Sequence, residues 1–211
     1  MRIHGVLFDM NGLFRHWRNT GARTSERTAG LPEGTIDRYA YQHPSYRLAR
    51  VGVLTDQQWA EDVTKRLTTD YGPHIRPALA PWREDRGEAA PDMIALLARI
   101  REQVPVGVLS NSIDALHDDL KHHGITFDDV MPSADLGVDK PSPHAYRLAA
   151  ERMGITPDLL AYFDDEPTFV RAAAVVGLHA HLFTHAADVR ERLRTAGLTT
   201  LKERTERGRR P

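Results

Sequence analysis

The second half of the chain repeats one pattern, in which a short apolar run is followed by a turn and an amphipathic helix. The pattern predicts strand and helix pairs at residues 104–109 and 113–123, 129–131 and 143–153, 160–163 and 167–176, and 179–183 and 186–196. Strands that alternate with helices form a parallel sheet with helices on both of its faces. We therefore expect an α/β fold with a doubly wound, Rossmann-like parallel sheet, to which the early apolar run at residues 5–8 adds a strand.

The ends of these predicted helices carry residues that suit them. Pro143 and Pro167 fit a first helical turn, where no amide hydrogen is needed, and Thr184 fits an N-cap. Glycine fits the position just past a helix, and it stands there at Gly124, Gly154 and Gly177.

Residues 13–87 differ from the rest, because they hold polar helices and turns and no clear buried strand. Thr55 and Gln58 are spaced as a capping box, and apolar residues then recur at every fourth position, which predicts an amphipathic helix. We expect a small helical cap at residues 13–87, inserted into a core made of residues 1–12 and 88–199. The basic residues 200–211 are expected to form a disordered tail.

The composition excludes several classes of function. The chain has no cysteine, so disulfides, thiolate metal sites and cysteine nucleophiles are ruled out. The formal net charge of -1 gives no general attraction to nucleic acid or to an anionic membrane. No apolar stretch approaches the ~20 residues that span a bilayer, and the N-terminus does not resemble a signal peptide. We expect a cytoplasmic protein without nucleic acid or membrane partners, whose oligomeric state the sequence leaves open.

Polar side chains with useful chemistry stand at four places at or near the predicted strand ends. They are Asp9, the pair Ser110 and Asn111, Lys140, and the pair Asp164 and Asp165. The carboxyl ends of parallel strands meet at one edge of a sheet, where ligands bind, so we expect these side chains to share a crevice. Together they offer a carboxylate nucleophile, a hydroxyl and an amide for an anion, a fixed cation, and carboxylates for a hard metal ion.

The order of these four motifs resembles that of the haloacid dehalogenase superfamily. The matching segments are residues 8–12, 108–111, 139–141 and 163–165, and the resemblance extends from about residue 3 to residue 183. The helical insertion between the first two motifs is similar to the subfamily with a small helical cap. Residues 134–137 and the last two motifs look most like the branch of sugar-phosphate phosphatases and the N-terminal phosphatase domain of bifunctional epoxide hydrolases.

The resemblance implies a phosphatase that acts on a small phosphorylated metabolite. Asp9 is implied to attack phosphorus and to form an aspartyl-phosphate, which water then hydrolyses. Ser110, Asn111 and Lys140 are implied to bind the phosphoryl oxygens, with Ser110 and Lys140 counted among the catalytic residues.

The cofactor implied by the resemblance is Mg²⁺. Its ligands would be Asp9, the main-chain carbonyl of Asn11, and Asp165, with Asp164 in or just outside the metal shell. Because Asn11 contributes only its main chain, its side chain does not have to be acidic for the metal to bind. The preference of Mg²⁺ for oxygen ligands agrees with this set.

Asn11 departs from the family pattern, because an acid that protonates the leaving oxygen is expected at this position. An amide does not transfer a proton, so we expect slow turnover of alkyl phosphates and nearly normal turnover of aryl phosphates, whose phenolate leaves without a proton. The nearby His16 is either an alternative proton donor that contacts substrate, or a residue of the surface or the cap. Asn11 fits either a natural replacement or an introduced Asp→Asn substitution.

Two other functions stay open. Haloacid dehalogenases also lack the acid at this position, but they use no Mg²⁺, and the pair Asp164 and Asp165 argues against a metal-independent dehalogenase-like hydrolase. A low-turnover binding or regulatory protein for a phosphate ligand is the other, and it predicts thermal stabilisation by the ligand without product.

Histidines and aromatic residues outside the motifs have several interpretations. A transition-metal site at His179 and His181 is disfavoured, because no carboxylate cluster accompanies them. An aromatic and basic patch in the predicted cap either selects the substrate or packs the cap. Its members are Tyr39, Tyr41, His43, Tyr46 and Arg47.

Overall fold

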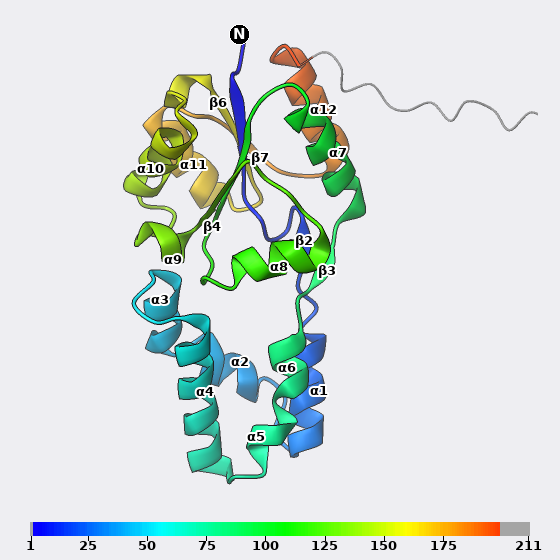
Figure 1. Cartoon of the computed structure of the whole chain (residues 1–211), viewed down its shortest axis with the longest axis vertical. Coiled ribbons are helices and arrows are strands. Elements are labelled where there is room, and N and C mark those ends of the chain that lie inside the picture. Colours follow the sequence, from blue (N-terminus) through cyan, green and yellow to red (C-terminus); the bar gives the residue numbers. More distant parts are fainter. Residues whose placement is uncertain (1, 199–211) are drawn as a thin grey trace, which may run out of the picture.

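The computed structural model of the chain describes residues 2–198 (Figure 1), so the basic tail expected at residues 200–211 lies outside the described residues. Within the described range, five parallel strands form one sheet in the order β5, β4, β1, β6 and β7. Their bounds are Gly5–Phe8 (β1), Val106–Ser110 (β4), Asp129–Pro132 (β5), Leu160–Asp164 (β6) and His179–Leu182 (β7). The sheet grows outward from β1 in both directions, which is the doubly wound order that the sequence predicts.

The register of the central strand brings several strand ends to one level. Phe8 pairs with Val108 of β4 and with Phe163 of β6. The next residues along β1 and β6 are Asp9 and Asp164, which are therefore neighbours at the carboxyl edge of the sheet. Ligands of open α/β sheets bind outside this edge, where the winding of the sheet reverses.

Alternating side chains of β1 face two separate apolar clusters. Val6 and Phe8 belong to one cluster, which α7, α8 and α12 cover, and Leu7 belongs to the other, which α10 and α11 cover. Figure 1 shows α7 and α12 on the opposite side of the sheet from α10 and α11. The bounds are Pro91–Arg101 (α7), Leu116–His123 (α8), Pro143–Met153 (α10), Pro167–Val176 (α11) and Ala186–Thr195 (α12). Burial on both faces explains why the strand is apolar throughout.

Most of the predicted helix ends are confirmed. Pro143 and Pro167 begin α10 and α11, and the three predicted glycines follow α8, α10 and α11 with positive φ angles. The N-cap predicted at Thr184 is wrong. His185 caps α12 instead, because its Nδ1 accepts a hydrogen bond from the amide of Asp188 at 3.1 Å.

Residues between β2 and β3 form helices that pack around an apolar cluster of their own. Trp59, Val63 and Leu67 of α4 are buried in it, and Thr55 and Gln58 form the predicted capping box. The helix bounds are Thr20–Ala29 (α1), Thr35–Ala40 (α2), Pro44–Arg50 (α3), Asp56–Tyr71 (α4), Ile75–Ala78 (α5) and Ala80–Glu84 (α6). Figure 1 shows this helical insertion beyond the carboxyl edge of the sheet.

A two-stranded ribbon joins the helical insertion to the core, with β2 (Arg15–His16) antiparallel to β3 (Glu88–Ala89). Leu13 and Phe14 precede the ribbon and are fully buried in an apolar cluster of the core. Phe14 packs edge-on against Phe8, with 5.3 Å between ring centroids. Leu13 and Phe14 thus pack with the core, whereas the sequence suggests a cap that begins at residue 13. The remaining short elements are α9 (Ser133–Leu136) and the 3₁₀ turn η1 (Pro157–Leu159).

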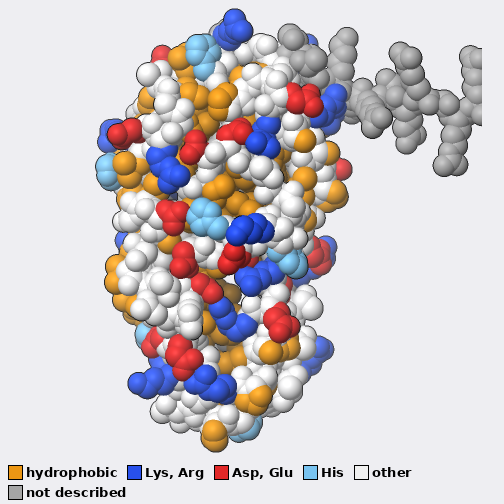
Figure 2. All heavy atoms as spheres, in the orientation of Figure 1, with side chains coloured by type: hydrophobic (Ala, Val, Ile, Leu, Met, Phe, Trp, Pro, Cys, Tyr) orange, Lys and Arg blue, Asp and Glu red, His pale blue; other side chains and the backbone are white. Residues whose placement is uncertain are grey.

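The surface carries charges of both signs. Figure 2 shows Lys and Arg side chains interspersed with Asp and Glu, which agrees with the small net charge of the sequence. Among residues 2–198, none of the helices has both the length and the apolar content that a membrane crossing demands.

Candidate active site

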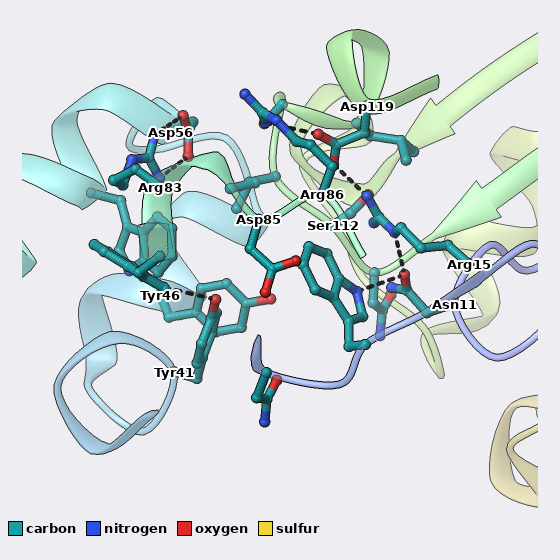
Figure 3. Close-up of a pocket in the computed structure, with 18 of the residues that line it drawn as sticks. Asn11, Arg15, Tyr41, Tyr46, Asp56, Arg83, Asp85, Arg86, Ser112 and Asp119 are labelled. Carbon is teal, nitrogen blue, oxygen red and sulfur yellow. Dashed lines mark hydrogen bonds and ion pairs between the residues drawn. The ribbon is translucent and has the colours of Figure 1, made fainter. Parts of the chain in front are cut away.

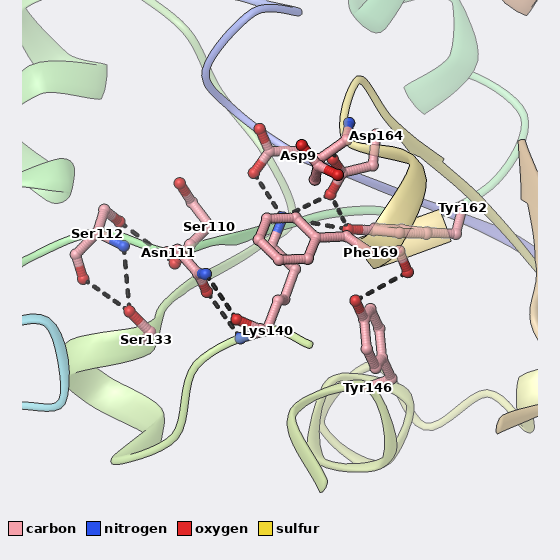
Figure 4. A network of polar contacts seen from close by, with 11 residues as sticks. Asp9, Ser110, Asn111, Ser112, Ser133, Lys140, Tyr146, Tyr162, Asp164 and Phe169 are labelled. Atoms are coloured by element: carbon pink, nitrogen blue, oxygen red, sulfur yellow. Dashed lines mark hydrogen bonds and ion pairs between the residues drawn. The ribbon is translucent and has the colours of Figure 1, made fainter. Parts of the chain in front are cut away.

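A buried lysine lies at the centre of the polar side chains at the carboxyl edge (Figure 4). Lys140 Nζ donates hydrogen bonds to Asp9 Oδ1 and to Asp164 Oδ2, each at 2.7 Å, and to the Tyr162 hydroxyl at 3.1 Å. Tyr162 in turn donates to Asp164. Lys140 is 2% exposed and Asp164 is 0% exposed, so solvent screens these ion pairs only weakly. The structure thus brings Asp9, Lys140 and Asp164 into direct contact.

Asn111 fixes the loop that carries the lysine. Its Nδ2 donates to the carbonyl of Lys140 at 2.8 Å, and its Oδ1 accepts from the Lys140 amide at 2.7 Å. Both ends of the amide are therefore used on the Lys140 backbone. This arrangement makes Asn111 a positioning residue for Lys140.

Ser110 Oγ is buried at the end of β4 and has no hydrogen-bond partner among the described residues. A buried polar group without a partner costs about 1–3 kcal/mol, and such groups in folded proteins call for an explanation. An anion bound beside Ser110 would accept the hydroxyl hydrogen and remove that cost. The atom therefore fits the phosphoryl-binding position that the sequence assigns to Ser110.

Asp9, Asp164 and Asp165 form a carboxylate cluster in which one oxygen of each lies within 4.8 Å of the others. Both oxygens of Asp164 already accept hydrogen bonds from protein groups, whereas Asp165 is exposed. Gly12 lets the Asp165 carboxylate approach the loop that follows β1, because a Cβ at position 12 would lie 2.0 Å from Asp165 Oδ2. Asp9 and Asp165 are thus the carboxylates best placed to bind a cation directly.

Burial and repulsion from neighbouring carboxylates raise the pKa values of Asp9 and Asp165. Burial is the main cause that raises the pKa of Asp9 to about 6, while Lys140 lowers it and Asp164 raises it further. Burial, followed by the charge of Asp164, also raises the pKa of Asp165. One ammonium faces three carboxylates, so a divalent cation would offset the surplus negative charge. The all-oxygen donor set fits Mg²⁺.

The side chain of Asn11 is hydrogen-bonded to Arg15 of β2 and to Trp17, which follows that strand (Figure 3). Its Oδ1 accepts hydrogen bonds from Arg15 Nε and Trp17 Nε1, both at 3.1 Å. The buried Arg15 also forms an ion pair with Asp119, whose other oxygen accepts from Arg86 at 2.8 Å. Residue 11 is therefore linked to a chain of three charged side chains.

His16 lies at the surface, and it is not among the residues that line the neighbouring cavity. Its neighbour Arg15 is 3% exposed and contacts Asn11 instead. Successive side chains of a strand point to opposite faces, so the two residues of β2 separate in this way. Sequence reasoning missed Arg15, and the sequence holds no signal for it, because a two-residue strand is too short to show an alternating pattern.

A cavity of about 370 Å³ lies between the helical insertion and the core, next to Asn11. Tyr41 and Tyr46 of the predicted aromatic patch line it, whereas the Tyr39 hydroxyl donates to Asp70 at 2.5 Å. Other residues that line the cavity are Arg15, Trp17, Trp59, Trp82, Arg83, Asp85, Arg86, Asn111 and Asp119.

The histidines of β7 and the following loop have other partners. His179 Nε2 lies 2.7 Å from the carbonyl of Asp158, and His185 caps α12. Burial lowers the pKa of His181, whose ring packs against Phe163. Among the described residues, these histidines do not belong to the group of potential metal ligands formed by the carboxylate cluster.

The sheet order, the helical insertion and the lysine-centred carboxylate cluster together define a class of hydrolase. A family model described as haloacid dehalogenase-like hydrolase matches residues 3–177, and the chain belongs to this family.

Two curated relatives within reach of sequence comparison are named as phosphatases. The chain is 30% identical to Phosphatase MT3486 of Mycobacterium tuberculosis (strain CDC 1551 / Oshkosh), over 90% of this chain and 92% of the relative. It is 23% identical to Fructose-1-phosphate phosphatase YqaB of Escherichia coli (strain K12), over 85% of this chain and 95% of the relative.

Solved structures with the same fold include both phosphate-bound and dehalogenase enzymes. The HAD family enzyme bt-2542 of Bacteroides thetaiotaomicron, in complex with magnesium and inorganic phosphate, has a TM-score of 0.68 at 17% identity, covering 86% of this chain and 94% of its own. The L-2-haloacid dehalogenase PA0810 has a TM-score of 0.64 at 21% identity, covering 83% and 82%. These structures share the fold of this chain, and the fold alone does not separate the two activities.

Proposed function

We propose that this hydrolase is a Mg²⁺-dependent phosphomonoesterase that acts on a small phosphorylated metabolite, with Asp9 as its nucleophile. The proposal is carried by the buried hydroxyl of Ser110, which has no partner within residues 2–198 and lies at the same sheet edge as the Lys140 ammonium and the Asp9 carboxylate. These groups match the three needs of phosphoryl transfer, which are a nucleophile and two donors for phosphoryl oxygens. The names of the two curated relatives support a phosphatase.

The reaction begins when a carboxylate oxygen of Asp9 attacks phosphorus. The bond from phosphorus to the leaving oxygen breaks, its electron pair stays on that oxygen, and an aspartyl-phosphate results. Lys140 and Ser110 hold the phosphoryl oxygens, and Asn111 keeps the lysine loop in place. Water then hydrolyses the aspartyl-phosphate and restores the Asp9 carboxylate.

The residues that would hold Mg²⁺ are Asp9, Asp165 and the main-chain carbonyl of Asn11. The ion supplies charge neutralisation, so that an anionic nucleophile and an anionic phosphate approach each other. Asp164 acts through Lys140, because both of its oxygens accept hydrogen bonds from the protein.

A panel of sugar, nucleotide and aryl phosphates, assayed with Mg²⁺ and with EDTA, tests this proposal. We expect Mg²⁺-dependent release of phosphate from the wild-type protein and from Asp158→Asn, a control at an exposed acid in η1. Asp9→Asn keeps the shape of the side chain but removes the nucleophile, so it should release no phosphate above background.

Two other results would replace the proposal. Release of chloride from a 2-haloacid in EDTA, with no phosphatase activity, would make the protein a metal-independent dehalogenase. Thermal stabilisation by inorganic phosphate without turnover of any ester, in both the wild type and Asn11→Asp, would make it a binding protein.

A further inference from the structure

The cavity beside Asn11 has an aromatic wall on the side of the helical insertion (Figure 3). Tyr41, Tyr46, Trp59 and Trp82 form it, and contacting rings lie between 5.1 and 5.6 Å apart at their centroids. Tyr41 keeps 39% of its surface exposed, and its hydroxyl accepts a hydrogen bond from Trp82 Nε1 at 3.3 Å. The wall therefore presents the Tyr41 ring to the cavity in a fixed orientation.

Trp17 lines the same cavity from the segment that follows β2. Its indole N–H donates to Asn11, and the Arg15 guanidinium lies 4.6 Å from the centre of its ring. The side chain is still 43% exposed. A second aromatic surface is thus held beside residue 11, the position next to the leaving group in the proposed reaction.

Charged side chains that line the cavity are already engaged by partners within the protein. Ion pairs and hydrogen bonds of this kind occupy the charged groups, so the exposed rings of Tyr41 and Trp17 are left as aromatic surfaces for a ligand. The pairs are Arg83 with Asp56, Arg15 and Arg86 with Asp119, Asp85 with the amides of Gly21 and Gly87, and Asp37 with Gln42.

Asn11 also restricts the leaving group. Arg15 and Trp17 both donate to Asn11 Oδ1, so the side-chain nitrogen of Asn11 points away from them. This amide nitrogen can donate a hydrogen bond to a leaving group, but it transfers no proton. A leaving oxygen beside it departs as an anion, which is easy for a phenol-type oxygen and difficult for an alkoxide. The chemistry of residue 11 and the lining of the cavity thus favour the same kind of substrate.

We infer that the substrate is an aryl phosphate monoester, whose ring packs against Tyr41 and Trp17 while its phosphate meets Asp9. The inference rests on the proposed phosphatase function and names the class of its substrate. The new bond joins the Asp9 oxygen to phosphorus, and the bond from phosphorus to the aryl oxygen breaks. The electron pair stays on the phenolate, which takes its proton from water after it leaves.

Three substrates separate this inference from the proposed function. Acetyl phosphate has a leaving group that needs no proton and carries no ring, 4-nitrophenyl phosphate adds the ring, and phosphocholine is a cationic alkyl ester. We expect kcat/KM for 4-nitrophenyl phosphate to exceed that for acetyl phosphate by about tenfold or more, with phosphocholine slowest, because the aryl ring stacks on two aromatic side chains.

Substitutions in the aromatic wall test whether the cavity causes the preference for the aryl ester. Tyr41→Leu should lower the ratio of 4-nitrophenyl to acetyl phosphate kcat/KM by about 3–10-fold, whereas Tyr41→Phe should keep it, because the ring does the stacking. Tyr39→Leu removes a tyrosine of the insertion that does not line the cavity, and it should leave the ratio unchanged.

Each contrary result is distinct. Turnover of acetyl phosphate without preference for the aryl ester, or with a preference for phosphocholine, overturns the inference and leaves the proposed function in place. An unchanged ratio in Tyr41→Leu also overturns it. Absence of turnover on all three substrates overturns the proposed function and this inference with it.

Discussion

Arg15 contacts Asn11 directly, and this contact changes what an acid placed at position 11 would achieve. Arg15 Nε lies 3.1 Å from the Asn11 side-chain oxygen. A carboxylate at that position would be stabilised in its charged form by the guanidinium, so it would be a poor proton donor. We predict that Asn11→Asp alone raises kcat/KM for an alkyl phosphate by less than about tenfold, out of the ~10²–10⁴ that general acid catalysis supplies.

Removing the Arg15 guanidinium should give the rest of the increase in kcat/KM. In Asn11→Asp combined with Arg15→Met, the new carboxyl no longer faces the guanidinium, and Asp119 keeps Arg86 as its partner. We predict a gain of about 10² or more on the alkyl ester, with little change on an aryl ester, measured by steady-state kinetics. Arg15→Met alone is the control. If the double variant gains no more than Asn11→Asp, Arg15 does not govern the protonation of residue 11.

Ser110 should show opposite effects on stability and on activity. Its buried hydroxyl has no partner among the described residues, so Ser110→Ala removes an uncompensated polar group and should stabilise the ligand-free protein by about 1 kcal/mol. The same change removes a donor to the phosphoryl group and should lower kcat/KM by about 10–100-fold. Urea unfolding without phosphate, together with kinetics, measures both effects.

Ser112 provides the matched control for this prediction. It is also buried, but its amide bonds to Ser133 Oγ at 3.1 Å, and its own hydroxyl donates to the carbonyl of Ser110. Ser112→Ala should therefore destabilise the protein. Destabilisation by Ser110→Ala as well would show that its hydroxyl has a partner in solution and would weaken the assignment of an anion site.

The sequence predicts which polar residues stand at the strand ends, but it does not predict the residues that hydrogen-bond to them. Asp9, Lys140 and Asp164 each lie in a recognisable motif. Because a parallel sheet gathers its strand ends at one edge, the sequence also predicts that these side chains share a crevice. Tyr162 sits among apolar neighbours in the sequence and Arg15 stands beside His16, and only the packed structure shows that they contact Lys140 and Asn11. Polar partners contributed by a strand interior or a two-residue strand leave no periodic pattern to detect.

At the scale of the element, Gly12 in the turn after β1 allows the Asp165 carboxylate to approach this turn. Gly12 has a φ of +78°, and a Cβ there would lie 2.0 Å from Asp165 Oδ2. We predict that Gly12→Ala displaces the Asp165 carboxylate and weakens Mg²⁺ binding by about tenfold or more, seen as a smaller rise in melting temperature on adding MgCl₂.

Gly124 separates this effect from simple backbone strain. It also has a positive φ, of +64°, but a Cβ there would meet nothing within 4 Å. Gly124→Ala should cost stability, on the order of 1 kcal/mol, while leaving the response to MgCl₂ intact. An equal loss of the MgCl₂ response in both variants would mean that the contact between Gly12 and Asp165 is not what matters.

Long elements with regular patterns were predicted to within a few residues, and short elements were not. α10 and α11 have proline at the start and glycine after the end, so both boundaries are chemically marked. The β2 and β3 ribbon has two residues per strand, too few to show alternation. Leu13 and Phe14 were placed in the insertion for the same reason, although their burial ties them to the core.

At the scale of the whole molecule, the insertion contacts the core next to the loop that carries Lys140. Arg50 of α3 forms an ion pair with Asp139, the residue before Lys140. A Cβ at Gly52 would lie 2.2 Å from the carbonyl of Ala134, so the backbones approach closely at the same place. The insertion is therefore coupled by direct contacts to the loop that carries the lysine.

Two arginines of α3 test this coupling. Arg50 is 26% exposed and pairs closely with Asp139, whereas Arg47 is 75% exposed and lies 3.9 Å from the same carboxylate. We predict that Arg50→Gln lowers kcat/KM by about fivefold, equivalent to about 1 kcal/mol, and Arg47→Gln by less than about twofold, because exposed pairs contribute little. The difference should shrink as salt screens the pair, so kinetics at low and high ionic strength measure it. Equal effects of the two substitutions would show that general positive charge on α3 matters, and not the contact that joins the insertion to the lysine loop.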